Sequence, residues 1–335
     1  MQGMPWPGAV ALSGGGDSLA LMHLLARWAK IQNAPAPPVL IVDHGLRRTS
    51  AADAKRAAGW AKALGLSAHV LTWKGKKPQG DIEAAAREAR YRLMGEWAAG
   101  NGVAALYLGH TQDDQAETFL LRLARGSGLD GLSAMRSLAP YPLAGYESLR
   151  LVRPLLEEPR DALRKYLAVL KQGWLEDPMN GDPRFARVRM RKIRPLLEEA
   201  GLSAQRIADA AAHLSRARTA LDEMTAHLIT RACRLEKTAA LVDAQALAAA
   251  PHEIGLRAFA GILMSVSGAQ YRPRFVRLNF LFGRIRAGEL GNGATLGGCR
   301  IGPAPKRQAV FGPGTLLIRP ETRLEKAHVT PEGIS

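Results

Sequence analysis

Short apolar runs alternate with amphipathic stretches through roughly the first 170 residues of the chain. Five of the apolar runs predict strands, at residues 10–12, 39–43, 68–73, 104–109 and 149–153. The amphipathic stretches predict helices at residues 18–30, 50–64, 82–99, 112–125 and 160–170. Strands separated by helices favour right-handed βαβ units, and therefore an α/β domain whose parallel sheet is covered on both faces. Ligands bind such sheets beyond the carboxyl ends of the strands, so we expect the site there.

The pattern changes near residue 200, where we predict a boundary between two domains, residues 1–200 and 201–335. Beyond it, large apolar residues recur every seven positions, at Ile207, Leu214, Leu221, Leu228 and Leu235. This stripe predicts one long helix, and it favours a packing seam against neighbouring helices over a coiled-coil dimer. Residues 253–265 predict a further helix, and the Gly- and Pro-rich segment 290–319 predicts short strands and turns. The second domain is thus expected to be smaller and mainly helical, with short strands at its end.

The composition fits a cytoplasmic protein with a substantial core. The chain has 335 residues, of which 47% are hydrophobic, enough for two folded domains. No apolar run is long enough to span a bilayer, and the N-terminus lacks the pattern of a secretion signal. The two cysteines, Cys233 and Cys299, form no CxxC pair, so neither a disulfide framework nor a metal site is suggested.

The charge balance points to a polyanionic partner. The chain has 46 Lys and Arg and 30 Asp and Glu, which gives a net charge of +16. This excess favours nucleic acid or an acidic membrane over a neutral partner. The alternative is an Arg-rich composition throughout the genome.

A stretch that contains Phe185 and no acid carries six cations: Arg184, Arg187, Arg189, Arg191, Lys192 and Arg194. Such a stretch can neutralise RNA phosphates and offer a ring for stacking, although a solvated basic helix face is the alternative. A second candidate patch comprises Arg272, Arg274, Arg277, Arg284 and Arg286.

The sharpest motif is a glycine loop that follows the first predicted strand and opens a helix. It reads Ser13, Gly14, Gly15, Gly16, Asp17, Ser18. Glycines let the backbone approach an anion closely, and a helix N-terminus offers unpaired N–H groups, so the loop predicts a phosphate site. Asp17 would repel a phosphate unless Mg²⁺ is shared between them. The alternative is an ordinary glycine turn with helix-capping residues. The loop matches neither GxxxxGK[ST] nor GxGxxG.

The loop resembles the SGGxDS motif of the N-type ATP pyrophosphatases, the PP-loop superfamily. Three further segments resemble the VDHGLR, ARxxRY and LGHxxDDQxET motifs of the tRNA(Ile)-lysidine synthases: residues 41–47, 86–91 and 108–118. A fourth segment, at residues 176–180, resembles that family's EDPxN motif. The four matches agree in order and spacing over about the first 200 residues. The resemblance implies an adenine nucleotide alpha hydrolase-like fold related to the Rossmann fold.

The resemblance also implies an activity: ATP-dependent attachment of lysine to the wobble cytidine of tRNA(Ile) with a CAU anticodon, through an adenylated cytidine. The implied ATP site comprises Ser13, Gly14, Gly15, Gly16, Asp17, Ser18, Asp43, His44 and His110, with Mg²⁺ at Asp17. Free L-lysine would be bound by Asp114, Glu117 and Arg90, and catalysis would rest on Asp17, Asp114 and Arg90. The basic stretch of residues 184–194 would bind the tRNA. A homodimer stays open.

Simpler interpretations of the single residues also stand. Thr111 and Asp114 fit a helix cap, His44 a packed side chain, and Arg90 a surface arginine. Asp114 is either a base or a clamp for the amine. Three rival functions stand beside the implied one. A tRNA thiolase needs cysteines near the motifs, an amidotransferase-type synthetase needs an ammonia source, and a degenerate RNA-binding protein would not turn over ATP.

Overall fold

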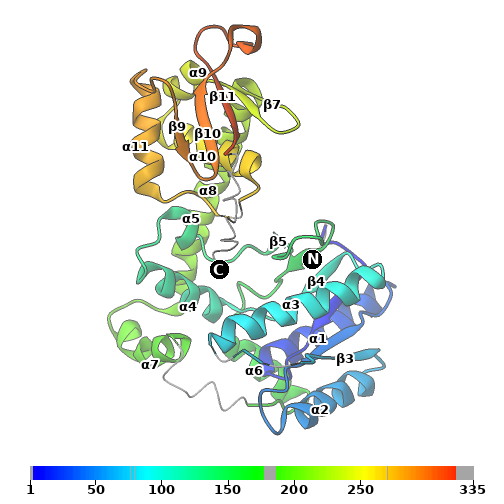
Figure 1. Ribbon diagram of the computed structural model, residues 1–335. Helices are drawn as coiled ribbons and strands as arrows, with labels where there is room; N and C mark the ends of the chain where they lie inside the picture. The colour runs from blue at the N-terminus through cyan, green and yellow to red at the C-terminus, as the bar shows by residue number, and fades with distance from the viewer. Residues whose placement is uncertain (1–2, 76, 79, 177–185, 270, 322–335) are drawn as a thin grey trace, which may run out of the picture. The chain divides into compact units, whose positions relative to one another are not determined.

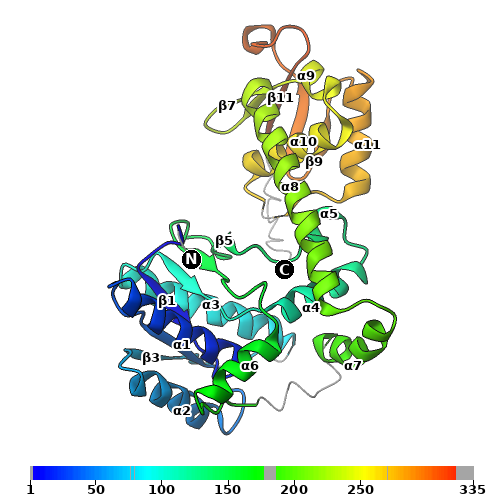
Figure 2. The same ribbon diagram turned by 180° about the vertical axis from the view of Figure 1, so that it is seen from behind.

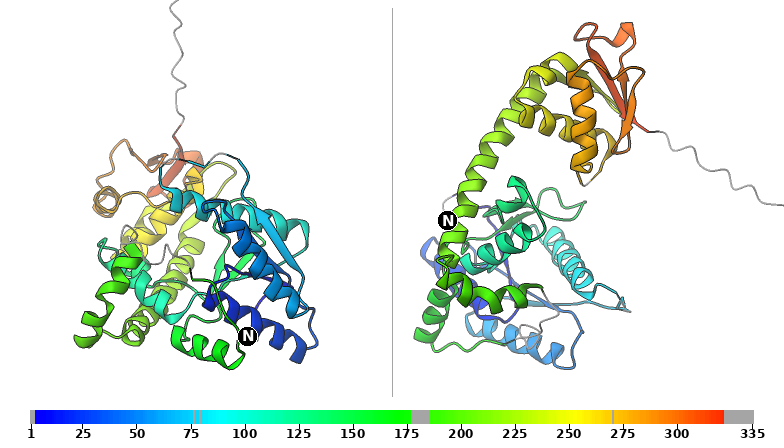
Figure 3. Two further views of the ribbon diagram at one scale, coloured as in Figure 1. Left: turned by 90° about the horizontal axis from the view of Figure 1, so that it is seen from below. Right: turned by 90° about the vertical axis from the view of Figure 1, so that its left-hand side faces the viewer.

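The computed structural model describes residues 3–75, 77–78, 80–176, 186–269 and 271–321. The chain forms two compact units, Met1–Arg216 and Ala217–Ser335. The division falls inside one helix, α8 (Ala204–Ala232), which is drawn as one long yellow-green ribbon in Figure 3. The part of Glu176–Asn180 that resembles EDPxN, together with Arg184 and Phe185, falls mostly outside the described residues. The functional domain ranges 1–200 and 201–335 stay a prediction. No helix in the described part of the chain has the length and apolar character needed to cross a membrane.

The first unit contains a six-stranded sheet in the order β3-β2-β1-β4-β6-β5. Its five parallel strands are β1 (Gly8–Ala11), β2 (Val39–Asp43), β3 (Ala68–Thr72), β4 (Ala105–Tyr107) and β6 (Arg150–Val152). These confirm the five predicted strands and the α/β class. The sixth strand, β5 (Leu138–Pro140), is antiparallel to β6 and was not predicted. It is a short, largely exposed edge strand, so it lacks the buried apolar run that revealed the others.

Helices cover both faces of this sheet. One face carries α1 (Gly16–Ile31), α2 (Ser50–Ala63) and α6 (Arg160–Val169), which share one apolar core with β1 and β2. The other face carries α3 (Ile82–Gly100), whose buried side chains form a second core. Figure 1 looks onto α3, and Figure 2 looks from behind onto α1 and α6. Because the chain changes face between β3 and β4, the neighbours β1 and β4 open a crevice at their carboxyl ends.

Three more helices belong to this unit. They are α4 (Gln112–Leu123), α5 (Leu129–Leu132) and α7 (Ala186–Glu199). Helix α4 begins shortly after β4 ends, and α7 packs against α4. This places the acidic start of α4 at the crevice and the basic helix α7 beside it, so the two candidate segments of the sequence are brought together.

The second unit is not mainly helical, and that prediction was wrong. It holds a five-stranded antiparallel sheet in the order β7-β8-β11-β10-β9. The strands are β7 (Cys233–Leu235), β8 (Ala240–Asp243), β9 (Ala294–Leu296), β10 (Cys299–Pro303) and β11 (Thr315–Pro320). The helices are α9 (Ala244–Ala249), α10 (His252–Ser267), α11 (Phe275–Arg286) and the 3-10 turn η2 (Lys306–Gln308). Helices α10 and α11 share a core with the sheet.

The heptad stripe explains part of that error. Ile207 and Leu228 are buried on α8, as a packing seam requires. Leu235, the last member of the predicted stripe, lies instead in β7 and is 59% exposed. The periodicity therefore ran past the end of the helix and hid the first strand of the sheet.

Candidate active site

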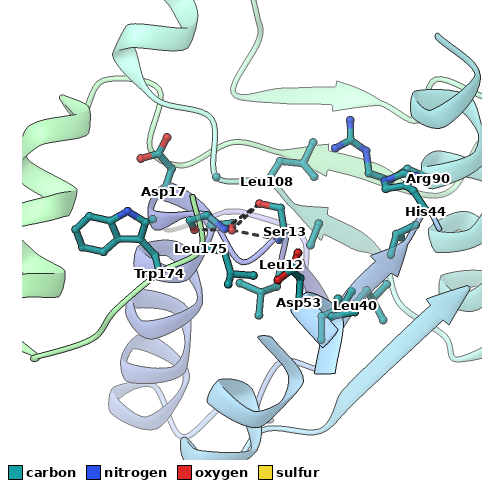
Figure 4. Close-up of a pocket in the computed structure, with 18 of the residues that line it drawn as sticks. Leu12, Ser13, Asp17, Leu40, His44, Asp53, Arg90, Leu108, Trp174 and Leu175 are labelled. Atoms are coloured by element: carbon teal, nitrogen blue, oxygen red, sulfur yellow. Dashed lines mark hydrogen bonds between the residues drawn. The ribbon is translucent and has the colours of Figure 1, made fainter. Parts of the chain in front are cut away.

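A cavity of about 950 Å³ opens at the carboxyl ends of the parallel strands. It is lined by the glycine loop, by the segments that follow β2 and β4, and by the start of α6. Figure 4 shows Asp17 and Trp174 toward one end of this cavity and His44 and Arg90 toward the other, with Ser13 between them. An elongated cavity therefore lies where the strand order predicts a crevice.

The glycine loop is shaped by its two serines. The Ser18 hydroxyl donates to the Gly15 carbonyl at 2.9 Å and lies 3.0 Å from the Ser13 hydroxyl. The backbone N–H of Ser13 donates to Ser18 Oγ at 3.2 Å. These bonds fold the loop back on the first turn of α1, which leaves the helix N-terminus facing the cavity as an anion site.

Two glycines are required by close approaches. Gly14 has a φ of +85°, and a Cβ there would lie 2.6 Å from a Leu175 side-chain atom. The Leu175 N–H also donates to the Gly14 carbonyl, at 2.9 Å. Gly109, which follows β4, would place a Cβ 2.8 Å from Ser18 Cα and 2.9 Å from the Asp17 carbonyl. Gly109 thus lets the strand end lie directly against the phosphate loop.

An arginine joins three predicted acids. Arg160 donates to Asp17 at 2.9 Å and to Asp114 at 3.0 Å, and its third nitrogen lies 3.6 Å from Glu117. Burial raises the pKa of Asp17, and Arg160 opposes that rise. Burial would lower the pKa of Arg160, but Asp114 and Asp17 outweigh it and the pKa is raised. The structure therefore brings Asp17, Asp114 and Glu117 together around one partly buried cation.

Asp114 performs two tasks at the start of α4. Its Oδ2 accepts from the backbone N–H and the hydroxyl of Thr111, at 2.9 and 3.1 Å, as in a helix cap. Its Oδ1 faces the cavity and meets Arg160. Asp114 therefore caps α4 and also lines the cavity, and its use as a base or a clamp for an amine stays a prediction.

The basic helix α7 is partly turned inward. Arg191 donates to both oxygens of Glu117, at 2.6 and 3.2 Å, and Arg194 pairs with Asp113. Burial would raise the pKa of Asp113, but the Arg160 N–H and Arg194 outweigh it and the pKa is lowered. Arg189 and Lys192 are exposed and Arg187 is half-buried. In the predicted RNA-binding stretch, Arg191 and Arg194 therefore pair with acids, whereas Arg189 and Lys192 are exposed at the surface.

His110 and Arg90 lie deeper in the cavity. Burial lowers the pKa of His110 to about 4, which keeps the ring neutral, and its buried Nδ1 has no hydrogen-bond partner among the described residues. Burial and the nearby Arg90 also lower the pKa of His44. Arg90 has a half-buried side chain whose guanidinium lies 5.8 Å from the Tyr91 ring centre. His44 and Arg90 therefore supply a neutral and a cationic group at the end of the cavity remote from Asp17, and His110 supplies a neutral ring on its wall.

Three of the residues predicted to bind ATP or lysine do not line the cavity. Asp43 is buried and accepts from the Gly45 N–H at 2.9 Å and from the Ser50 hydroxyl, so its carboxylate shapes the turn after β2. Gly14 shapes the loop through Leu175. Glu117 reaches the cavity only through Arg160 and Arg191, which line it.

The cavity-lining residues that sequence reasoning missed include Arg160, Arg164, Trp174 and Leu175. Arg160 and Arg164 lie one turn apart at the start of α6. A signal existed for both, because they follow the predicted strand at residues 149–153 and so lie at the carboxyl edge of the sheet. Trp174 and Leu175 come from an irregular segment, for which the sequence offers no comparable signal.

Within the described part of the chain, no cluster of three or more His, Cys, Asp or Glu side chains could hold a metal by itself. Mg²⁺ is commonly held by one or two carboxylates together with substrate phosphates and water, and does not need such a cluster. Asp17 at the phosphate loop fits that donor set. The loop, the strand order and the crevice together define an ATP-binding domain of the PP-loop class.

Comparison with known proteins agrees with this class. The PP-loop domain model ATP_bind_3 matches residues 8–197. A tRNA(Ile)-lysidine synthase of Ruegeria pomeroyi is 40% identical over 87% of this chain and 68% of its own length. One of Wolbachia pipientis wMel is 34% identical over 96% and 72%, and one of Methylobacterium nodulans is 39% identical over 90% and 91%. The chain belongs to the tRNA(Ile)-lysidine synthase family.

A solved structure supports the fold alone. The U34-tRNA thiolase NcsA from Methanococcus maripaludis, determined with its [4Fe-4S] cluster, aligns with a TM-score of 0.51 at 19% identity. The alignment covers 62% of this chain and 71% of that one. The α/β architecture is therefore shared with a tRNA-modifying protein whose chemistry differs.

Proposed function

We propose that this chain attaches lysine to C2 of the wobble cytidine in tRNA(Ile) with a CAU anticodon, consuming ATP and releasing AMP and pyrophosphate. One observation carries the proposal beyond family membership. The phosphate-loop carboxylate Asp17 and the acid pair Asp114 and Glu117 meet around Arg160 at one cavity. An ATP site and an amine site that lie side by side are what a two-step ligation needs.

In the first step, the phosphates of ATP lie on the loop N–H groups and the N-terminus of α1. The C2 oxygen of the cytidine attacks the α-phosphate, and pyrophosphate leaves. The cytidine must leave its stack to enter the cavity. The loop N–H groups, together with Arg160 and Arg164 on the cavity wall, stabilise the charge on the phosphoryl group.

In the second step, the ε-amine of lysine attacks C2 of the adenylated cytidine. AMP leaves with the oxygen that C2 carried. The amine must give up a proton before or during attack, and the cavity-facing Oδ1 of Asp114 is placed to receive it or to orient the amine. Arg90, a cation at the other end of the cavity, suits the carboxylate of lysine.

Asp17 is the residue that would hold Mg²⁺. When bound there, the ion would neutralise charge on the leaving pyrophosphate. Burial raises the pKa of Asp17, and a cation bound beside the carboxylate would oppose that rise.

Helix α7 is the proposed contact for the anticodon stem-loop. Arg189 and Lys192 are exposed, while Arg187 is close enough to lower the pKa of His110 inside the cavity. A helix that joins surface cations to the cavity can hold RNA phosphates while one base enters the site.

The thiolase alternative is disfavoured by the cysteines. Both Cys233 and Cys299 belong to the second unit, and no residue that lines the described cavity is a cysteine. A sulfur-transferring relative would need a thiol or a cluster ligand at this cavity.

The proposal is tested by AMP release from ATP in the presence of lysine and tRNA transcripts. We expect turnover only when lysine and tRNA(Ile) with a CAU anticodon are both present. A tRNA(Met) transcript, which has the same anticodon, serves as the control for selectivity. Turnover that needs a sulfur donor, or that proceeds without RNA, would contradict the proposal.

A further inference from the structure

Arg160 is the one described residue that contacts acids of both proposed substrate sites. Its guanidinium lies 2.9 Å from Asp17, in the phosphate loop, and 3.0 Å from Asp114, in the amine site. Glu117, the second acid of the amine site, lies 3.6 Å away. The Arg160 side chain is 15% exposed and lines the cavity. Nucleotide and lysine would consequently both act on the same guanidinium.

The backbone of Arg160 is fixed, whereas its side chain is long. Arg160 is the first residue of α6, and its N–H donates to Asp113 Oδ2 at 2.9 Å. Asp113 is held in turn by Arg194. The guanidinium can therefore change partners by rotation about side-chain bonds while helix α6 stays in place.

A lysine amine competes with this guanidinium for Asp114. Oδ2 of Asp114 already accepts two hydrogen bonds from Thr111, so Oδ1 is the oxygen that an incoming ammonium must use. Arg160 lies on that same Oδ1. Two cations on one oxygen in a partly buried site repel each other, which weakens lysine binding for as long as Arg160 stays there.

The phosphates of ATP offer Arg160 another partner. Because Arg160 already reaches Asp17, its guanidinium lies beside the loop on which the phosphates would rest. Guanidinium groups pair strongly with phosphate oxygens through two parallel hydrogen bonds. Binding of nucleotide thus draws the guanidinium toward the loop and away from Asp114.

We propose that Arg160 is a positioning residue that couples the two sites, so that lysine binds tightly only once nucleotide occupies the phosphate loop. This inference rests on the proposed function. Coupling of this kind is reciprocal, so lysine must tighten nucleotide binding by the same factor. The consequence for the reaction is an order: the amine is admitted after the nucleotide that activates its target.

The test measures binding of radiolabelled lysine by equilibrium dialysis with the full chain and tRNA(Ile) transcript. The titration is run with and without Mg²⁺ and α,β-methylene ATP, which does not release pyrophosphate. We expect the analogue to lower the Kd of lysine about tenfold, within the usual range of coupling between sites. The reverse titration, of analogue with and without lysine, must give the same factor.

Variants assign the coupling to this side chain. In R160Q, lysine binding without nucleotide should tighten, and the analogue should change it less than about twofold. R160K keeps the positive charge but loses the planar guanidinium that can form two parallel hydrogen bonds. Its coupling between analogue and lysine should lie between those of the natural protein and R160Q. R164Q is the matched control, since it removes the same charge from the same helix and cavity wall but leaves the contacts of Asp114. It should weaken binding of the analogue itself and keep the coupling when the analogue is saturating.

The outcomes separate the two proposals. Lysine binding that is equally tight with and without the analogue in the natural protein overturns the coupling but leaves the proposed function standing. Coupling that survives in folded R160Q, judged by an unchanged thermal melt, also overturns the role of Arg160. Absence of lysine binding together with absence of lysine-dependent AMP release overturns the proposed function, and the coupling with it.

Discussion

Replacing Gly109 by alanine should damage the phosphate loop without touching any side chain of the site. The added Cβ would lie 2.8 Å from Ser18 Cα and 2.9 Å from the carbonyl carbon and oxygen of Asp17. Contacts below 3.0 Å are essentially never seen for real Cβ atoms, and all three atoms here are backbone. The strand end and the start of α1 must therefore move apart by several tenths of an ångström.

The cost of that movement can be bounded. Overpacking a well-packed site costs about 1–3 kcal/mol, and about 1.4 kcal/mol corresponds to a tenfold change in an equilibrium constant. We expect G109A to weaken binding of α,β-methylene ATP by about tenfold to a hundredfold, to lower the free energy of unfolding, or to divide the strain between both. Urea unfolding and calorimetric titration measure the two quantities.

Gly59 provides the matched control. It lies exposed in α2, with no atom within 4 Å of an added Cβ. G59A should leave nucleotide binding unchanged and stabilise the helix by about 0.5–1 kcal/mol. If G109A binds the analogue and unfolds as the natural protein does, the close approach of β4 to the phosphate loop is refuted.

Three further predictions concern single side chains. D114N should raise the KM for lysine about tenfold or more while the first turnover still releases pyrophosphate. An equal loss of pyrophosphate release and of lysine attachment would count against an amine site at Asp114. The pKa of His110 is lowered from 6.5 to about 4, so the unfolded chain gains a proton first as pH falls. The free energy of unfolding, measured with urea, should fall more between pH 6.5 and 4 in the natural protein than in H110N. An equal fall in both proteins would contradict this prediction. K192Q should reduce the slope of log Kd for tRNA against log salt by about 0.7–0.9, whereas K62Q on α2 should not.

The first unit was largely predictable because its central strands β1, β2 and β4 are buried on both faces. Val10 pairs with Val39 and Tyr107 in the sheet, and such continuous apolar runs are legible without a partner. The second unit was less predictable, because β7 continues the apolar spacing of the helix before it and so concealed the start of the antiparallel sheet. The spacing of apolar residues identifies a helix but does not show where that helix ends.

The site shows the same division. The phosphate loop and the acids of α4 were predictable, because their spacing has a chemical meaning along the chain. The position of Arg160 after a predicted strand was a usable signal, but its contacts were not predictable, since Asp17 and Asp114 are 143 and 46 residues away in sequence. Similarly, no local feature indicates that Arg191 faces Glu117 while Lys192 faces solvent. These assignments depend on packing of α4, α6 and α7.

The most direct measurement of the central claim is nucleoside mass analysis of tRNA(Ile) transcript after incubation with this protein, ATP and isotopically labelled lysine. The account predicts that one cytidine, at the wobble position, gains the labelled lysine with loss of water, and that D114N reduces the yield. A transcript whose wobble cytidine is unchanged, or which gains sulfur in place of lysine, would contradict it.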